Sequence, residues 1–223
     1  MTINNLRETY NTISESYQSK KSEAWYDLIS IIPELKQETS GYLIDVGAGN
    51  GRNLKFVQRT LVLALDISEN LLRNYVANLS DQRVMGSATH LPIRKNVAEE
   101  VYSIAVVHHL ENDQLRIRAI GELYRINSMG GGTNITVWRK WRTQQKEMLF
   151  AKIRKRESID ELVNHNRPWK DPSGNTLGTR FYHYYTWKEL IKQIKISGFL
   201  IDQRIIMGGK HNDANFLVKL LKN

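Results

Sequence analysis

The sequence predicts an α/β fold, in which a mostly parallel, seven-stranded sheet ends in an antiparallel C-terminal hairpin and carries helices on both faces. Three patterns predict it. Short apolar runs alternate with stretches of helical period, the first run enters a glycine cluster, and the last two runs are joined by a glycine-containing turn without a helix. Alternation of this kind gives right-handed crossovers between parallel strands, whereas strands joined without a helix pair antiparallel.

The elements follow in chain order. Between Leu6 and Tyr17, apolar residues recur at spacings of three and four, which is one face of a helix. A second such stretch begins at Trp25 and stops at Pro33. Ser68 marks the N-cap of a helix after the second strand. The remaining patterns predict helices over 112–126 and 187–196, and strands over 42–46, 61–65, 82–86, 101–107, 133–138, 199–207 and 215–221.

Composition limits the function. The chain has no cysteine, which excludes disulfides, a cysteine nucleophile and a thiolate metal site, and no metal ligand set is expected. The formal net charge is +9. Residues 139–157 hold eight basic and two acidic side chains, a local balance of +6. Such a concentration of charge predicts an anionic partner. The alternatives are an exposed basic helix with no specific role and, more weakly, a membrane surface.

The apolar runs also bear on location. None approaches the roughly 20 residues that span a bilayer, and the polar N-terminal stretch has no apolar core of a signal peptide. We therefore expect a cytoplasmic protein that does not bind membranes.

The glycine-rich stretch is the sharpest motif. Asp45 opens the pattern D-x-G-x-G-x-G directly after a strand, and Asp66 ends the next strand 21 residues later. Glycines let the backbone approach a ligand closely, and an acidic residue at a strand end can accept ribose hydroxyls. A dinucleotide site favours G-x-G-x-x-G, whereas the sixth position here is Arg52. The carboxylate of Asp45 suits a cationic ligand group. The alternative is a glycine-rich turn without a ligand.

This pattern resembles motif I of the Rossmann-like class I S-adenosylmethionine-dependent methyltransferases. The resemblance implies that S-adenosylmethionine is the cofactor and S-adenosylhomocysteine the product. Ser87 stands where that superfamily commonly has an aspartate near the adenine, so the contact there falls to its hydroxyl or to the Ala88 backbone N–H. The cofactor residues implied in this way are Asp45, Gly47, Ala48, Gly49, Gly51, Asp66, Ile67, Ser87, Ala88 and Ala105.

The second half of the chain narrows the resemblance. Ser103–Leu110, Arg116–Arg125 and the run ending at Trp138, together with Arg167–Lys170 and Arg180–His183, resemble the Trm9 family of tRNA wobble-uridine carboxymethyl methyltransferases, which includes the methyltransferase domain of ALKBH8. This resemblance implies methylation of the carboxylate of 5-carboxymethyluridine at position 34 of tRNA. It also implies a small zinc-binding activator of the Trm112 type, which pairs with the third strand near residues 82–87.

A carboxylate nucleophile is ionised near neutral pH and needs no general base. The enzyme must instead orient it and hold its charge. The catalytic candidates are His108, His109, Arg116 and Arg180, of which one histidine is expected to line the transfer site and the other to pack or cap. The substrate-binding candidates are Lys21, Arg118, Trp169, Tyr182, His183, Arg154, Lys155 and Arg156. A solvated helix face is the alternative for Arg116 and Arg118, and core packing is the alternative for the aromatic residues.

We expect all 223 residues to form one methyltransferase domain. Its parts are N-terminal helices (1–40), a cofactor-binding core (41–138), a basic and aromatic insertion (139–185), and a final helix with two strands (186–223). Two other functions stay open. One is methylation of a small carboxylic acid, which would not depend on tRNA. The other is a non-catalytic tRNA- or partner-binding protein of the same fold.

Overall fold

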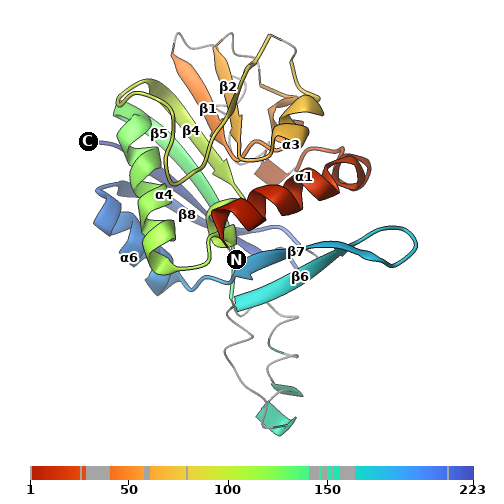
Figure 1. The fold of residues 1–223 in the computed structure, drawn as a ribbon. Helices are drawn as coiled ribbons and strands as arrows, with labels where there is room; N and C mark the ends of the chain where they lie inside the picture. The colour runs from red at the N-terminus through yellow and green to blue at the C-terminus, as the bar shows by residue number, and fades with distance from the viewer. Residues whose placement is uncertain are drawn as a thin grey trace.

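A computed structural model gives the structure of the chain. It describes residues 2–25, 27–28, 41–57, 61–78, 80–140, 146, 150–151, 153–155, 164–209 and 211–223. A seven-stranded sheet in the order β3-β2-β1-β4-β5-β9-β8 forms its centre, and a separate hairpin, β6-β7, extends to one side (Figure 1). This sheet confirms the predicted fold.

The first five strands of the sheet are parallel, and the last two form the predicted antiparallel hairpin. The parallel strands are β1 (Tyr42–Val46), β2 (Val62–Asp66), β3 (Gln82–Met85), β4 (Ala98–Ile104) and β5 (Asn127–Trp138). Strand β9 (Asn215–Leu221) lies antiparallel between β5 and β8 (Leu200–Met207). Strands β3 and β8 therefore form the two edges.

Polar caps begin the helices as the sequence indicates. The helices are α1 (Ile3–Lys20), α3 (Glu69–Arg73), α4 (Asp113–Ile126) and α6 (Trp187–Ser197), with short 3-10 turns at η2 (Arg52–Leu54) and η3 (Val107–His109). The side chains of Thr2, Ser68, Asn112 and Thr186 each accept a backbone N–H of the first turn. Such caps stabilise helix ends by about 1 kcal/mol each.

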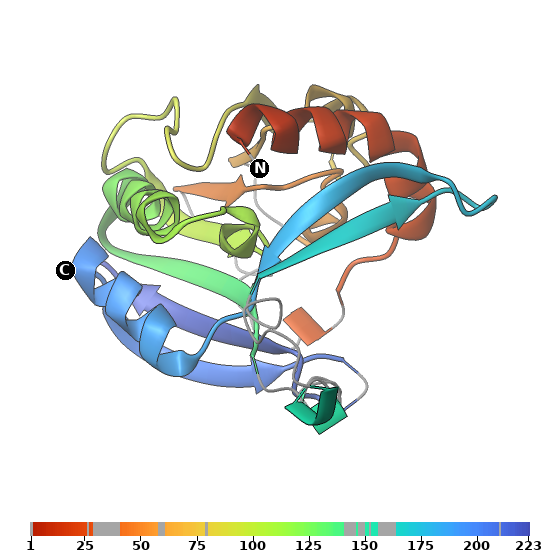
Figure 2. The same cartoon turned by 60° about the horizontal axis from the view of Figure 1, so that its bottom comes forward.

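Two apolar clusters cover the two faces of the sheet. Helices α4 and α6 lie side by side on one face (Figure 2), where Leu123 and Leu190 pack with strand residues such as Ile44. On the other face, Leu43 of β1 belongs to a cluster that includes Leu28. Adjacent residues of β1 thus point to opposite faces, as the period of a strand requires.

Two elements differ from the predictions. Residues 139–185, expected as an insertion without assigned elements, contain β6 (Asn164–Lys170) and β7 (Thr176–His183). Strand β5 starts at Asn127 and not at the predicted Thr133, and its pairing with β4 shifts register between Asn127 and Gly132. The helix expected from Trp25 falls largely on residues outside the described set.

Among the residues that the structure describes, no helix is long and apolar enough to cross a membrane, and no group of three or more acidic, histidine or cysteine side chains could hold a metal ion.

Candidate active site

A cavity of about 540 Å³ opens at the carboxyl ends of the parallel strands, beside the point where the strand order reverses between β1 and β4. Ligands of open α/β sheets bind at this place. Of the predicted cofactor residues, those that line the cavity are Gly47, Ala48, Gly49, Asp66, Ile67, Ser87, Ala88 and Ala105. Of the predicted catalytic and substrate residues, those that line it are Lys21, His108, His109, Arg180 and Tyr182.

The glycine loop after β1 uses its glycines in two ways. Gly47 and Gly51 have φ angles of 82° and 76°, a conformation that side chains disfavour. A Cβ on Gly51 would also lie 2.2 Å from Cε2 of Tyr75. The nearest atom to a Cβ on Gly49, in contrast, is Leu71 Cδ1 at 4.0 Å. Gly49 therefore presents open backbone to the cavity, whereas Gly51, which does not line it, shapes the loop.

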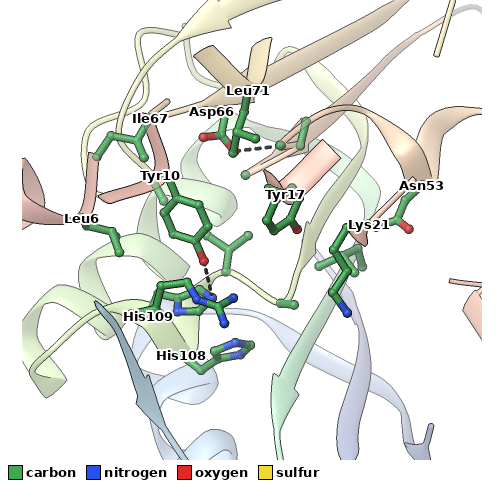
Figure 3. A pocket seen from close by; sticks show the side chains of 18 of the residues that line it. Leu6, Tyr10, Tyr17, Lys21, Asn53, Asp66, Ile67, Leu71, His108 and His109 are labelled. Carbon is green, nitrogen blue, oxygen red and sulfur yellow. Dashed lines mark hydrogen bonds between the residues drawn. The ribbon is translucent and has the colours of Figure 1, made fainter. Parts of the chain in front are cut away.

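Asp66 ends β2 inside the cavity and holds the glycine loop in place (Figure 3). Its Oδ2 accepts the backbone N–H of Gly49 at 2.8 Å, and its Oδ1 accepts that of Ser68 at 2.8 Å. Burial raises the pKa of Asp66, and these backbone donors oppose the rise. A carboxylate oxygen can accept two hydrogen bonds. Asp66 can therefore bind ligand hydroxyls while it keeps both loop contacts.

The two histidines of η3 have different hydrogen-bond partners. His109 Nδ1 lies 2.7 Å from the Phe181 carbonyl oxygen, so it carries the proton, and Nε2 accepts the Tyr10 hydroxyl at 3.1 Å. His108 Nδ1 accepts the backbone N–H of Trp138 at 3.4 Å. Among the described residues, His108 Nε2 has no hydrogen-bond partner. Of the two, His108 alone therefore has a ring nitrogen without a partner among the described residues, and this nitrogen is buried beside the cavity.

Both imidazoles are neutral near pH 7. Burial lowers the pKa of His108 well below its usual value, and the neighbouring His109 adds to this. Burial lowers the pKa of His109 to about 4. These histidines can therefore donate or accept hydrogen bonds but do not supply positive charge.

Positive charge comes from Lys21, Arg52 and Arg180, which line the cavity away from Asp66. Burial lowers the pKa of Lys21, and the charges of Arg52 and Arg180 lower it further. Figure 3 shows Tyr17 between Asp66 and Lys21. Burial raises the pKa of Tyr17, Arg52 and Arg180 lower it, and Asp66 raises it. The cavity thus has an acidic side and a basic side, with Tyr17 between them.

Helix α1 covers the cavity and is tied to loops at its middle and near its C-terminal end. Ser68 Oγ donates to Asn11 Oδ1 at 2.7 Å, and Asn50 Nδ2 donates to Gln18 Oε1 at 2.7 Å. The sequence pattern indicated a packing face here and did not identify a site. The sequence did contain one signal of a site, because this face of the helix carries Tyr10 and Tyr17 in place of aliphatic residues. Lining residues that the sequence reasoning missed include Ile3, Leu6, Tyr10, Tyr17, Trp25, Arg52, Asn53, Leu71 and Trp138.

Comparison with known proteins agrees with this fold and site. A family model described as a methyltransferase domain matches residues 44–133, which include the glycine loop and Asp66. A chain from the structure of a complex between the Haloferax volcanii Trm112 methyltransferase activator and a methyltransferase superposes with a TM-score of 0.67 at 12% identity, over 96% of both chains.

The chain has the fold of the class I S-adenosylmethionine-dependent methyltransferases.

Sequence relatives of this chain confirm the resemblance to the Trm9 and ALKBH8 group. A tRNA (carboxymethyluridine(34)-5-O)-methyltransferase of Arabidopsis thaliana is 29% identical over 133 residues, which cover 60% of this chain and 32% of the relative. An enzyme of the same name from Schizosaccharomyces pombe is 23% identical over 208 residues, covering 86% of this chain and 87% of the relative. The chain therefore spans about a third of the plant relative and most of the yeast one.

The loop of this methyltransferase fits S-adenosylmethionine, whose methionine moiety carries a sulfonium and an amino group. Asp45 is buried at the end of β1, and its Oδ1 has no hydrogen-bond partner among the described residues. An unpaired buried carboxylate is destabilising, so a cationic ligand group nearby would relieve it. Asp45 itself does not line the cavity, so its effect on a ligand is electrostatic. Burial raises the pKa of Asp45 to about 7, and the charge of Asp66 contributes.

We expect the stability of the ligand-free methyltransferase to fall as the pH rises from 4 to 7 and then to level off. The folded state keeps on Asp45 a proton that the unfolded chain releases near pH 4, so folding is favoured at the lower pH. The loss is on the order of 1–4 kcal/mol. Asp45→Asn should remove most of this slope in thermal unfolding measured at pH 5 and pH 8. Asp202→Asn, at an exposed position on β8, should keep it. Equal slopes in the two variants would contradict the prediction.

Arg116 and His183, both predicted to act on substrate, are buried away from the cavity. Arg116 donates to the Leu110 carbonyl oxygen at 2.8 Å and is ion-paired with Asp113. The two ring nitrogens of His183 contact Asn164 Oδ1 at 2.8 Å and Glu189 Oε1 at 2.6 Å. Their side chains join structural elements, because both terminal nitrogens of Arg116 and both ring nitrogens of His183 are already bonded to the protein.

Four more of the predicted substrate residues, Arg118, Trp169, Arg154 and Lys155, do not line the cavity. Arg118 is exposed on α4. Trp169 stacks on Tyr17 with ring centroids 5.6 Å apart, and its Nε1 donates to Ser16 Oγ at 2.7 Å, which fixes the β6-β7 hairpin to α1. The exposed Arg154 and Lys155 do not line the cavity. Arg156 lies outside the described residues.

Proposed function

We propose that this methyltransferase esterifies the carboxylate of 5-carboxymethyluridine at the wobble position of tRNA. The names of its sequence relatives support the substrate. The observation that carries the proposal is the basic side of the cavity. Among the described residues, neither Lys21 nor Arg180 has an ion pair with an acidic side chain, and Lys21 lies near the charges of both Arg52 and Arg180. Three cations around one cavity favour an anionic substrate group.

Cofactor contacts follow from the acidic side. We propose that Asp66 accepts the ribose hydroxyls, that the backbone of Gly49 faces the methionine moiety, and that Ser87 and Ala88 flank the adenine. The Ser87 hydroxyl already accepts the Thr89 backbone N–H at 3.3 Å and lies 2.9 Å from Thr89 Oγ1. Ser87 therefore shapes the adenine end more than it binds there.

When bound, S-adenosylmethionine would supply an electrophilic methyl group for a carboxylate oxygen, and its sulfur would be the leaving group that keeps the electron pair of the carbon–sulfur bond. No proton moves. Arg180 and Lys21 hold the carboxylate, and His108 Nε2–H donates a hydrogen bond that helps to orient the nucleoside. Neutral imidazoles suit this task because a proton donated to the carboxylate would remove the nucleophile. Positioning of this kind contributes several kcal/mol to transfer reactions.

The direct test is methyl transfer from labelled S-adenosylmethionine to bulk tRNA that lacks the ester, followed by nucleoside mass analysis. A base-labile methyl ester on 5-carboxymethyluridine is the expected product. Absence of transfer in the presence of bound cofactor would overturn the tRNA proposal and leave a small carboxylic acid as the substrate. Transfer to another nucleoside would also overturn it.

A Trm112-type activator is proposed to pair with β3. Most side chains of this edge strand are exposed, as expected for a surface that a partner covers. The apolar side chain of Met85 is 54% exposed. Unpaired strand edges invite pairing with another chain. The transfer assay should be run with and without the activator, and an increase with the activator is expected. Because the substrate is a tRNA, we also propose that the methyltransferase works in the cytoplasm.

We expect the basic segment after β5 to supply part of the tRNA affinity. Arg154 and Lys155 are exposed, and each phosphate contact that is lost lowers the salt dependence of binding. Neutralising Arg154, Lys155 and Arg156 together should reduce the slope of log affinity against log salt by up to about three. The measurement is tRNA binding at several salt concentrations, with Lys188, Lys192 and Lys195 of α6 neutralised in the control. An unchanged slope would remove the segment from the tRNA surface.

A further inference from the structure

The cavity extends beyond the region that the cofactor residues occupy. Its cofactor end lies over β1, β2 and the loop after β3. Its distal end is lined by residues of the turn between β8 and β9 (Gly208–Asn215) and by Trp25. Register explains how this turn reaches the site, because Asn215 at the start of β9 pairs with Trp138 at the carboxyl end of β5. The turn therefore sits at the same edge of the sheet as the glycine loop.

Hydrogen bonds join the described residues of this turn to one another and to β5. The backbone N–H of Gly208 donates to Asn212 Oδ1 at 2.7 Å, and the N–H of Ala214 donates to the Gly208 carbonyl oxygen at 2.9 Å. Arg139 donates its backbone N–H to the Ala214 carbonyl oxygen at 3.0 Å. These bonds fix Gly208 to Asn212 and Ala214, and they fix Ala214 to the end of β5.

Small residues of this turn pack against the indole of Trp25 and against each other. A Cβ on Gly208 would lie 2.8 Å from Cζ2 of Trp25, and a Cβ on Gly209 would lie 2.7 Å from that of Ala214. The backbone N–H of Trp25 donates to Asn53 Oδ1 at 3.1 Å, which ties it to the end of the glycine loop. Gly209, Ala214 and Trp25 all line the cavity. Glycine and alanine backbone beside an indole leaves a narrow, flat surface that suits a planar ring.

We propose that Trp25 together with Gly208, Gly209 and Ala214 forms a nucleobase subsite that selects the modified uridine. This inference rests on the proposed function and specifies where the base lies. Lys21 lines the same cavity, so a base held against the turn can direct its anionic substituent toward the basic side. Discrimination then combines a steric limit, set by Gly209 and Ala214, with the charge of Lys21.

The test compares binding of one tRNA that carries 5-carboxymethyluridine at position 34 with binding of the same tRNA carrying uridine there. Wild type should prefer the modified tRNA by at least about tenfold. Ala214→Leu fills the subsite and should bring this preference close to one, while the affinities for S-adenosylmethionine and for the unmodified tRNA stay unchanged. Ala214→Ser, which keeps the space, should retain the preference.

A second pair of variants, at Trp25, keeps the proposal testable if Ala214→Leu does not fold. Trp25→Leu should lose the preference and Trp25→Phe should retain most of it. A preference that survives both Ala214→Leu and Trp25→Leu would overturn the subsite. Loss of S-adenosylmethionine binding in Ala214→Leu would also overturn it, because the turn would then belong to the cofactor site. Failure of the proposed function itself is distinguishable, since wild type would then neither prefer nor methylate the modified tRNA.

Discussion

Asp66→Ala should weaken S-adenosylmethionine binding by at least about 100-fold, since hydrogen bonds to a charged group contribute about 1.5–3 kcal/mol each. Two losses combine. The variant removes the acceptor for the ribose hydroxyls, and it releases the backbone N–H groups of Gly49 and Ser68, each 2.8 Å from the carboxylate. The glycine loop then loses the contact that positions it. Calorimetric titration with S-adenosylmethionine measures the change.

Binding of tRNA to the Asp66→Ala variant should stay close to wild type, because Asp66 lies away from the cations Lys21 and Arg180. Asp202→Ala is the matched control, since Asp202 is exposed on β8. It should change neither affinity. An equal loss of cofactor and tRNA binding in Asp66→Ala would contradict the assignment of Asp66 to the cofactor and would indicate a disrupted fold.

Arg180→Met should lower kcat/KM for tRNA methylation by at least about 100-fold, because removing a buried charge partner typically costs about 2–5 kcal/mol. Arg180 comes from β7 and lies over the rings of Trp169 and Tyr182, at 4.5 and 5.2 Å from their centroids. Methionine keeps the length and the apolar contact of the side chain but removes its charge. Cofactor affinity should remain unchanged, since Arg180 lies on the basic side of the cavity.

Arg118→Met is the control for Arg180→Met. Both arginines are candidates from the sequence for contact with the substrate, yet Arg118 is exposed on α4 and does not line the cavity. It should have near-normal kcat/KM. Arg180→Lys keeps the positive charge but not the shape of the guanidinium group. Partial activity is expected, because lysine lacks the planar fork of arginine. Similar losses in Arg118→Met and Arg180→Met would show that the cavity does not separate the two residues as proposed.

Much of the fold could be predicted because its signals are local. Runs such as 42–46 and 215–221 are apolar over the length of one strand, and Ser68 caps a helix through atoms three residues apart. The β6-β7 hairpin was not predicted. Its strands are polar, with the exposure of β6 alternating along Asn164–Lys170. They are stabilised by contacts with α1, such as Trp169 with Ser16, which are 153 residues apart.

The candidate site divides in the same way. The sequence determined the cofactor side, since Gly49 and Asp66 are fixed by a strand–loop–strand unit whose geometry follows from spacing. It also placed the histidines at a strand end. It did not determine which histidine has a free donor, because the partners of His109, Tyr10 and Phe181, are 99 and 72 residues away.

The tertiary structure decided the substrate side. Arg116 and Arg180 are equivalent candidates in the sequence. In the structure, Arg116 is bonded to Asp113 and to the Leu110 carbonyl oxygen, whereas Arg180 lines the cavity with Lys21. The physical reason is that a charged side chain acquires its role from the groups that surround it after folding. Spacing along the chain fixes which backbone faces a ligand, and only the packing of distant segments fixes which charges do.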